Sequence, residues 1–326
     1  MKKNILIVIV SFFIYSINAQ INILNYDIIK EDLGLINYQL KNLDITNTKP
    51  SISKIEKSTY LSQDKSKFEL NESEKYILKN GLAIKGDYES AASEYLDAYK
   101  INFNFTYKND LITEINTISA DGNDYIKYFY NADKTISKIE VLSYGEKMLY
   151  QVNQANSKIT IKLMNSQNEV TTIYDYTFSN GKITEKEVEF LDYSSVENTN
   201  YSYTPKGKLT KQEYKKDNKL QKISTYTYND KNDLEEVSIL DYSDKTFMGA
   251  KKSSLKSEYI YDKFGNWIVR KTTSSGFLNN EKEQDLRKLT YTNKTITGTD
   301  NLETLEDKLL DEKVLEEIKQ YKKSKN

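Results

Sequence analysis

The chain repeats a short pattern in which two aromatic or apolar residues are separated by one position. Residues two apart share one face of a β-strand, and aromatic residues suit the half-buried surface of a sheet. The eight pairs are Phe105 and Tyr107, Tyr128 and Tyr130, Tyr150 and Val152, Tyr176 and Phe178, Tyr201 and Tyr203, Tyr226 and Tyr228, Tyr259 and Tyr261, and Leu289 and Tyr291. Their second members lie 22 to 33 residues apart. This spacing predicts a mainly β protein, with a long antiparallel β-hairpin meander of about 12–16 strands, twisted or curled, over residues 101–299.

The stretch from Tyr259 to Arg270 shows the repeat most clearly. Asp262-Lys263-Phe264-Gly265 places Asp at the first and Gly at the fourth position of a type I turn, where a positive φ costs Gly little. Trp267 then begins the returning strand. Other predicted turns reach the same outcome with other residues: Thr204-Pro205-Lys206-Gly207, Ser179-Asn180-Gly181-Lys182 and, without glycine, Asn131-Ala132-Asp133-Lys134 and Asn229-Asp230-Lys231-Asn232.

The two faces of the predicted sheet differ in polarity. The aromatic pairs make one face apolar, and the returning strands carry the charged residues Lys186, Glu187, Lys211, Glu213, Glu235 and Glu236, which we assign to the other face. Sheets of more than about ten strands tend to curl, split or twist. The aromatic face is therefore covered in one of two ways: the sheet curls upon itself, or flanking helices pack against it.

Residues 20–100 lack the repeat, and we expect an N-terminal helical and loop region that caps or leads into the sheet. Apolar residues of Ile28 to Leu43 recur near the helical period, Thr46 to Leu70 is polar and predicts a loop, and Glu72 to Leu82 predicts a second helix. The stretch from Gly86 to Tyr99 fits either a capping helix or the first strand.

The last segment, residues 300–326, predicts an amphipathic helix. Asp300 and Glu303 have the spacing of a capping box, and the following stripe is apolar. The stripe consists of Leu302, Leu305, Leu309, Leu315 and Ile318. We expect this helix to dock on the end of the sheet; binding to a membrane surface or a partner is the alternative.

The N-terminus has the features of a secretory signal peptide over residues 1–19. Lys2 and Lys3 precede a run from Ile5 to Ile17 that is apolar apart from two serines, and Ala19 occupies a cleavage position. A membrane anchor is the alternative, but the run is shorter than the roughly 20 residues that span a bilayer. We expect an exported protein, in the periplasm, on the outer surface or outside the cell, with no transmembrane segment after cleavage.

Composition narrows the available chemistry. The chain has no cysteine and no histidine, so it is not a lipoprotein, has no disulfides and lacks the usual general base and zinc ligands. Its 47 basic and 48 acidic residues are interspersed, which does not favour nucleic acid as a partner. We expect no catalytic residues, no cofactor and no metal; Asp121, Asn123 and Asp124 resemble a turn more than a calcium loop.

The motif Tyr261-Asp262-x-x-Gly265, followed by an extended apolar segment, resembles the YD repeats of RHS-type bacterial surface and toxin-associated proteins and of short secreted YD-repeat-like proteins. The resemblance covers about 200 residues, from Ile101 to Gly298. Its other copies keep the aromatic pair and the turn but lose Asp or Gly. The resemblance implies a β-repeat architecture and, as one functional option, an accessory or immunity-like partner of a secreted toxin.

Recognition is the function that the sequence favours. An exported β-repeat scaffold would present a binding surface for a protein or a glycan at the cell envelope, with Tyr259, Tyr261 and Trp267 as candidate ligand-contacting aromatics. The alternative for these three residues is that they fill the core. The alternative for the chain is a carboxylate-dependent hydrolase of envelope polysaccharide, since 48 acidic residues always include a suitably spaced pair.

Overall fold

The computed structural model describes residues 28–29, 33, 51–62, 68–80, 82–92, 97–155, 157–243, 249–276 and 282–302. The described chain is built from strands: β1 (Ile52–Ser62), β2 (Glu69–Lys79), β3 (Leu82–Ser90), β4 (Tyr99–Lys108), β5 (Leu111–Ser119), β6 (Gly122–Tyr130), β7 (Ile136–Ser143), β8 (Glu146–Ala155), β9 (Lys158–Met164), β10 (Val170–Ser179), β11 (Lys182–Phe190), β12 (Ser195–Tyr203), β13 (Leu209–Lys216), β14 (Lys219–Tyr228), β15 (Leu234–Asp241), β16 (Lys251–Tyr261), β17 (Trp267–Gly276), β18 (Lys282–Tyr291) and β19 (Ile296–Gly298).

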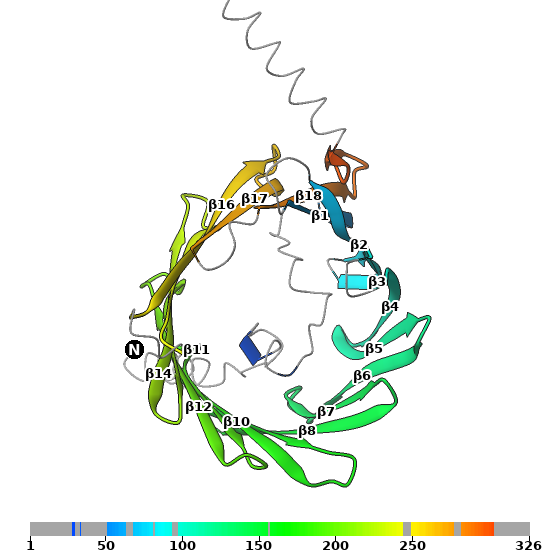
Figure 1. The fold of residues 1–326 in the computed structure, drawn as a ribbon. Helices are drawn as coiled ribbons and strands as arrows, with labels where there is room; N and C mark the ends of the chain where they lie inside the picture. Colours follow the sequence, from blue (N-terminus) through cyan, green and yellow to red (C-terminus); the bar gives the residue numbers. More distant parts are fainter. Residues whose placement is uncertain are drawn as a thin grey trace, which may run out of the picture.

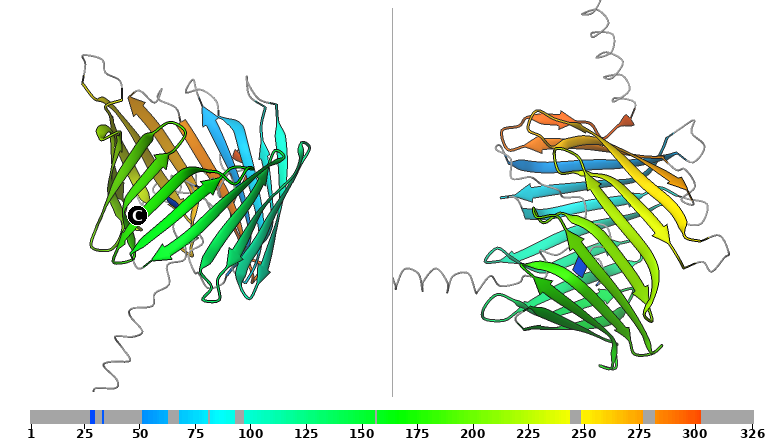
Figure 2. Two further views of the ribbon diagram at one scale, coloured as in Figure 1. Left: turned by 90° about the horizontal axis from the view of Figure 1, so that it is seen from below. Right: turned by 90° about the vertical axis from the view of Figure 1, so that its left-hand side faces the viewer.

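The strands close into a barrel. Each strand pairs antiparallel with the next one along the chain, and β18 also pairs with β1 over ten residue positions, which joins the two ends of the sheet. The result is a closed barrel of 18 strands. The short strand β19 is additional and pairs with the C-terminal end of β18, which β17 does not reach. Figures 1 and 2 show the strands wrapping obliquely around a central axis. The predicted hairpin meander is confirmed, and the sheet curls upon itself.

The aromatic repeat marks one end of the barrel. Its eight pairs lie near the ends of the even-numbered strands β4 to β18, each followed by a turn into the next strand. Tyr76 and Leu78 on β2 form a ninth pair in the same position, both with less than a tenth of their surface exposed. This copy was not predicted from the sequence, because it lies in the stretch predicted to be helical.

Four of the five predicted turns share one backbone conformation whether or not they contain glycine; the shorter turn from Ser179 to Lys182 has positive φ at both Asn180 and Gly181, 49° and 70°. Gly265 and Gly207 have φ of 84° and 81°, and Lys134 and Asn232 occupy the same turn position with φ of 69° and 68°. In each turn a side-chain or backbone oxygen of the first residue accepts from the residues that follow; Asp262 Oδ1 accepts from the N–H of Phe264 at 2.9 Å and of Asn266 at 3.0 Å. The turn, rather than glycine, is therefore the repeated element.

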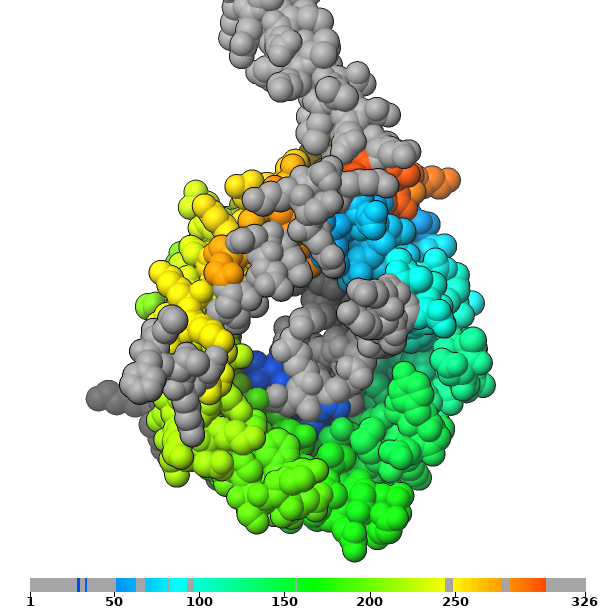
Figure 3. Space-filling view, in the orientation of Figure 1, coloured from blue at the N-terminus to red at the C-terminus, as the bar shows by residue number. Residues whose placement is uncertain are grey.

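The inner face of the barrel is mainly apolar and includes a segment of the N-terminal region. Ile29 and Leu33 are 0% and 3% exposed, and they belong to the same cluster as Phe103, Ile139 and Tyr176 from the wall. The Tyr150 hydroxyl donates to the Leu33 carbonyl oxygen at 3.1 Å. Residues 28–29 lie inside the ring in Figure 1. The wall surrounds a central hollow in the space-filling view of Figure 3.

The outer face is polar and charged. Strand register places Glu114 of β5 opposite Lys127 of β6 on this face. Lys147 of β8 contacts Glu140 of β7 at 3.1 Å on the same face. Glu187, Lys211, Glu213 and Glu236 also lie on it, as predicted. Lys186 is a correction, because it pairs with the inward-facing Tyr176 and so lies on the inner face. The predicted difference in polarity between the two faces is otherwise confirmed.

Two parts of the prediction for residues 20–100 are wrong, whereas Ile28 and Ile29 are helical, in agreement with the helix predicted from Ile28. Thr46 to Leu70 contains β1 instead of a loop, and Glu72 to Leu82 is β2 instead of a helix. Both strands turn charged side chains inward, which removes the apolar–polar alternation that indicates a strand. In the stretch that was left open, Gly86 lies in β3, where a side chain would meet the Tyr76 ring at 2.8 Å.

The remaining predicted elements lie at the edges of the described chain. The signal peptide over residues 1–19 lies outside the described residues, as does the Ile28–Leu43 helix apart from Ile28, Ile29 and Leu33. Of the C-terminal helix, only residues 300–302 are described; Leu302 packs on the outer wall against Val269 and Leu286. Within the described ranges, no helix is long and apolar enough to cross a bilayer.

Candidate functional site

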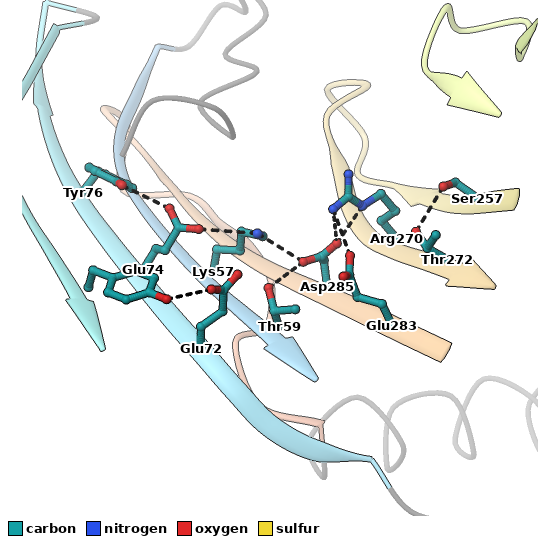
Figure 4. A network of polar contacts seen from close by, with 11 residues as sticks. Lys57, Thr59, Glu72, Glu74, Tyr76, Ser257, Arg270, Thr272, Glu283 and Asp285 are labelled. Carbon is teal, nitrogen blue, oxygen red and sulfur yellow. Dashed lines mark hydrogen bonds and ion pairs between the residues drawn. The ribbon is translucent and has the colours of Figure 1, made fainter. Parts of the chain in front are cut away.

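A network of charged side chains lies on the inner wall where the first and last strands meet (Figure 4). Register places Lys57 of β1 between Arg287 of β18 and Glu74 of β2, and Asp285 between Thr59 of β1 and Arg270 of β17. Directly opposed residues of antiparallel strands share a face and lie in contact range. We call the group Lys57, Thr59, Glu74, Arg270, Glu283 and Asp285 the seam network, since it spans the closure of the barrel.

Asp285 is the centre of the seam network and is 0% exposed. Its Oδ1 accepts from Thr59 Oγ1 at 2.7 Å and lies 3.2 Å from Lys57 Nζ. Its Oδ2 accepts from Arg270 Nε at 2.6 Å and contacts the same guanidinium at Nη2, 2.5 Å away. Both carboxylate oxygens are therefore held by strands on either side of β18.

The network continues into β2 and, along the same inward face of β18, to Glu283. Lys57 Nζ lies 3.4 Å from Glu74 Oε1, and Tyr76 donates its hydroxyl to Glu74 Oε2 at 3.0 Å. Arg270 also binds Glu283 Oε1 at 3.2 Å, and 36% of the Glu283 side chain is exposed. The side chains of Lys57 and Glu74 are 5% and 4% exposed. A buried core of charges thus ends in one carboxylate that reaches solvent.

The carboxyl groups of the network have pKa values shifted in opposite directions. Burial alone would raise the pKa of Asp285, but the charges of Lys57 and Arg270 and the Thr59 hydrogen bond outweigh it and hold that pKa below its ordinary value. Burial raises the pKa of Glu74 against the attraction of Lys57. The pKa of Glu283 is also raised, by burial and then by the neighbouring Asp285 charge.

The three candidate ligand-contacting aromatics lie together on the inner wall beside the seam network. The Tyr259 ring is 6.0 Å from the Tyr261 ring and 6.4 Å from the Trp267 ring, between centroids. Trp267 is 5% exposed, and the Arg287 guanidinium lies 4.1 Å from its ring centroid. Such a contact is a buried cation–π interaction.

Tyrosine hydroxyls of the repeat reach back to the preceding hairpin. Tyr259 donates to the Leu234 carbonyl oxygen at 2.7 Å, and Tyr261 donates to Asp233 Oδ2 at 2.5 Å. The same backward bond joins Tyr107 to Ala83, Tyr130 to Ile112 and Tyr203 to Ile183, at 2.9, 2.7 and 2.8 Å. These bonds explain why tyrosine rather than phenylalanine dominates the repeat.

The seam network was not predicted from the sequence. Its members come from β1, β2, β17 and β18, which no local pattern connects. One signal was available: Glu283, Asp285 and Arg287 alternate in phase with Leu289 and Tyr291, which places charges on the apolar face of β18. Charges on that face require partners.

No side-chain cluster suited to a metal stands out. Among the described residues, no group of three or more His, Cys, Asp or Glu side chains is close enough to hold an ion. The acidic groups of the seam network contact Lys57 and Arg270 instead.

No protein-family model matches the chain, and no curated protein matches it. Among solved structures, a porin-like protein from Bacteroides uniformis is 12% identical with a TM-score of 0.40, and the match covers 74% of this chain and 98% of that one. A porin-like protein from Bacteroides vulgatus is 8% identical, with a TM-score of 0.28 and the same coverage. A TcdB2-TccC3-Cdc42 structure is 10% identical, with a TM-score of 0.30, and the match covers 74% of this chain and 12% of that chain. Likenesses this weak do not bear on function.

Proposed function

We propose that the chain is an exported, non-enzymatic β-barrel scaffold that works in water at the cell envelope and presents a binding surface for a protein or a glycan. The observation that carries the proposal is the polarity of the wall. Outside the seam network and Lys186, the side chains that face the axis are mainly apolar and aromatic, whereas charged side chains are paired along the outward face.

The outward charges set this barrel apart from one that sits in a bilayer. A lipid-facing wall is an apolar band, and a Lys or Arg at the midplane costs about 2–4 kcal/mol. Here Lys127, Glu140 and Asp175 lie within outward rows of their strands, and they bind neighbouring outward charges such as Glu114, Lys147 and Lys158. A wall of this kind is stable in water.

The seam network supports a role without catalysis. A hydrolase that uses two carboxylates needs both within reach of the substrate. Asp285 is fully buried and both of its oxygens are engaged, so a pair built from Glu283 and Asp285 has one member that substrate does not reach. Within the seam network, Glu283 is the carboxylate that reaches the interior, and one carboxylate does not complete that mechanism.

Vesicle flotation tests the location in water. The purified full chain is mixed with phospholipid vesicles without detergent and centrifuged through a density gradient, at low salt and again at high salt to remove surface adsorption. We expect the protein to stay with the soluble fraction. Flotation with the vesicles at high salt would overturn the proposal.

A hydrolysis assay tests the absence of catalysis. The purified chain is incubated with envelope polysaccharide, and reducing ends are measured against a Glu283→Gln variant. We expect no release from either protein. Release by the native chain that the variant lacks would establish the hydrolase instead.

A further inference from the structure

We propose that the outer wall over β6 to β9 carries a groove that binds an acidic polysaccharide. This inference rests on the proposed function, because the groove is available to a ligand only if the outer wall faces water. The groove has a volume of about 890 Å³ and is lined by Phe129, Ser137, Lys138, Gln151, Val152, Asn153, Thr160 and Lys162.

The groove is built from one lateral row of side chains. Phe129 pairs with Lys138, Lys138 with Gln151, and Gln151 with Lys162, so that β6, β7, β8 and β9 each contribute one outward residue. Neighbouring strands lie about 4.8 Å apart, which makes the row roughly 14 Å long and separates the two lysines by roughly 10 Å. A site of this length suits an extended ligand.

The charge of the groove favours an anion. The two acidic side chains beside it already bind other cations: Glu140 contacts Lys147 at 3.1 Å, and Asp175 contacts Lys158 at 2.9 Å. The groove lining itself contains the ammonium groups of Lys138 and Lys162 and no carboxylate. Its charge is therefore set by these two lysines.

A second depression on the outer wall shows the contrast. It has a volume of about 220 Å³ and combines both signs of charge, with Glu56, Glu89, Asp87 and Asp300 among Lys75 and Lys100. Lys100 binds Glu89 directly, and Glu56 is held by Lys54 and Lys288. With Glu74 and Lys57 included, five carboxylates face three ammonium groups, so the lining is net negative and does not attract an anion.

Phe129 supplies an apolar surface within the charged row. It is 38% exposed on a wall whose neighbours are polar, and the Lys138 ammonium lies 3.9 Å from its ring centroid. An exposed ring can stack on the apolar face of a sugar, while an adjacent ammonium binds a carboxylate or sulfate on the same unit. This combination indicates a ligand with both a ring face and an acidic group.

The remaining residues favour a polysaccharide over an acidic peptide. An extended peptide commonly adds to a free strand edge, but each of β6 to β9 is paired on both sides. Recognition here uses side chains alone. The amides of Gln151 and Asn153 and the hydroxyl of Ser137 donate and accept hydrogen bonds, which matches a ligand rich in hydroxyl groups.

Binding measurements on the full chain test the groove. Calorimetric titrations would use two acidic polysaccharides, polygalacturonate and alginate, with neutral dextran and poly-L-glutamate for comparison. Three proteins join the native chain: Phe129→Ala, the double variant Lys138→Gln/Lys162→Gln, and the control Lys252→Gln/Lys271→Gln. The control loses the same charge from exposed positions of β16 and β17.

We expect an acidic polysaccharide to bind the native chain and the control equally. The Lys138→Gln/Lys162→Gln variant is expected to lose about tenfold or more in affinity, since a contact with a charged group is worth about one decade. Phe129→Ala is expected to weaken polysaccharide binding several-fold and to leave any poly-L-glutamate binding unchanged. Unfolding curves of all variants are expected to match, because the substituted side chains lie on the outer wall.

Three results would overturn the inference. An equal loss of polysaccharide affinity in the Lys252→Gln/Lys271→Gln control would assign binding to overall charge. Poly-L-glutamate binding as tight as polysaccharide binding, with no effect of Phe129→Ala on either, would assign the groove to acidic polypeptides. Absence of binding to both acidic polysaccharides would remove the site. In that last case vesicle flotation still decides whether the barrel works in water, so the two failures are distinguishable.

Discussion

At the residue scale, Asp285 shows how the barrel uses buried charge. A buried ion pair is weak evidence for stability, since desolvation offsets the attraction, but removal of one partner leaves the other charge uncompensated. Asp285 bonds to Thr59 on β1 and Arg270 on β17, and these contacts form only in one register of closure. We interpret the seam network as a device that specifies how the first and last strands pair.

Loss of the Asp285 charge is therefore expected to be costly. Asp285→Asn keeps the shape of the side chain but removes the central charge between the buried Lys57 and the partly exposed Arg270, so we expect a loss of about 3 kcal/mol in the free energy of unfolding. Urea unfolding followed by circular dichroism measures it. The control is Asp175→Asn on the outer wall, where a surface pair is worth about 0–1 kcal/mol. Similar losses in both variants would contradict the central role of Asp285.

The same carboxyl groups predict how stability depends on pH. The pKa of Asp285 lies below its ordinary 3.8, so its ionised form contributes stability that is complete above that value and is lost as the pH falls through the folded-state pKa. Glu74 and Glu283 act in the opposite direction. Burial raises their pKa above 4.5, so the folded state favours their protonated forms and stability is lost as the pH rises through the raised values.

We therefore expect the urea midpoint to pass through a maximum on the acid side of neutrality. Asp285→Asn is expected to flatten the decline at low pH, and Glu283→Gln to reduce the decline at higher pH. Midpoints measured in steps between about pH 3 and pH 7 resolve the two limbs. Unchanged limbs in the two variants would assign the pH dependence to other groups.

At the element scale, the hairpin turn with its left-handed fourth residue is the unit of the fold. Gly265 adopts this conformation, and a β-carbon placed there would have no atom within 4 Å. Lys134 adopts the same conformation with a side chain. A left-handed L-residue costs roughly 1–2 kcal/mol relative to the right-handed form. The non-glycine turns retain this strained conformation because the strand pairs on both sides fix the geometry.

Exchange of residues at this position tests the account. We expect Lys134→Gly to raise the free energy of unfolding by about 0.5–1 kcal/mol and Gly265→Ala to lower it by about 1 kcal/mol, because only the backbone conformation changes. Thermal and urea unfolding of the two variants measure the effects. A Lys134→Gly variant less stable than the native chain would show that entropy of the unfolded state outweighs the strain.

The elements that the sequence predicted are those whose signals are local. The Tyr259–Tyr261 pair and the Asp262–Gly265 turn predict a hairpin without reference to any other part of the chain, and so do their weaker copies. β2 was missed because its inward face carries Glu72 and Glu74 before Tyr76, and these carboxylates find partners in Tyr88 and Lys57. A buried charge with a distant partner looks like a surface residue to any local pattern, and the seam network was missed for the same reason.

At the whole-molecule scale, closure joins residues that lie more than two hundred positions apart. Ser53 donates its hydroxyl to the Thr290 carbonyl oxygen at 3.0 Å, and Lys288 contacts Glu56 across the seam at 3.5 Å. A meander of this length could equally remain an open sheet with the same hairpins. The pairing of β1 with β18 distinguishes the two, and it also removes the free edges through which sheets aggregate.

An engineered disulfide tests closure, and the absence of cysteine makes the experiment unambiguous. Glu56 and Lys288 are paired outward residues of β1 and β18. Opposed residues in antiparallel strands have α-carbons about 4.5–5.5 Å apart, within the range that a disulfide spans. We expect Glu56→Cys/Lys288→Cys to oxidise completely, as peptide mass spectrometry would show, and to raise stability by about 5 kcal/mol in the chain-entropy model.

Glu236→Cys/Lys256→Cys is the matched control, because β15 and β16 pair in an open sheet as well as in a closed barrel. Oxidation of the control pair without oxidation of the seam pair would show that the sheet is open in solution, since only closure brings β1 and β18 together.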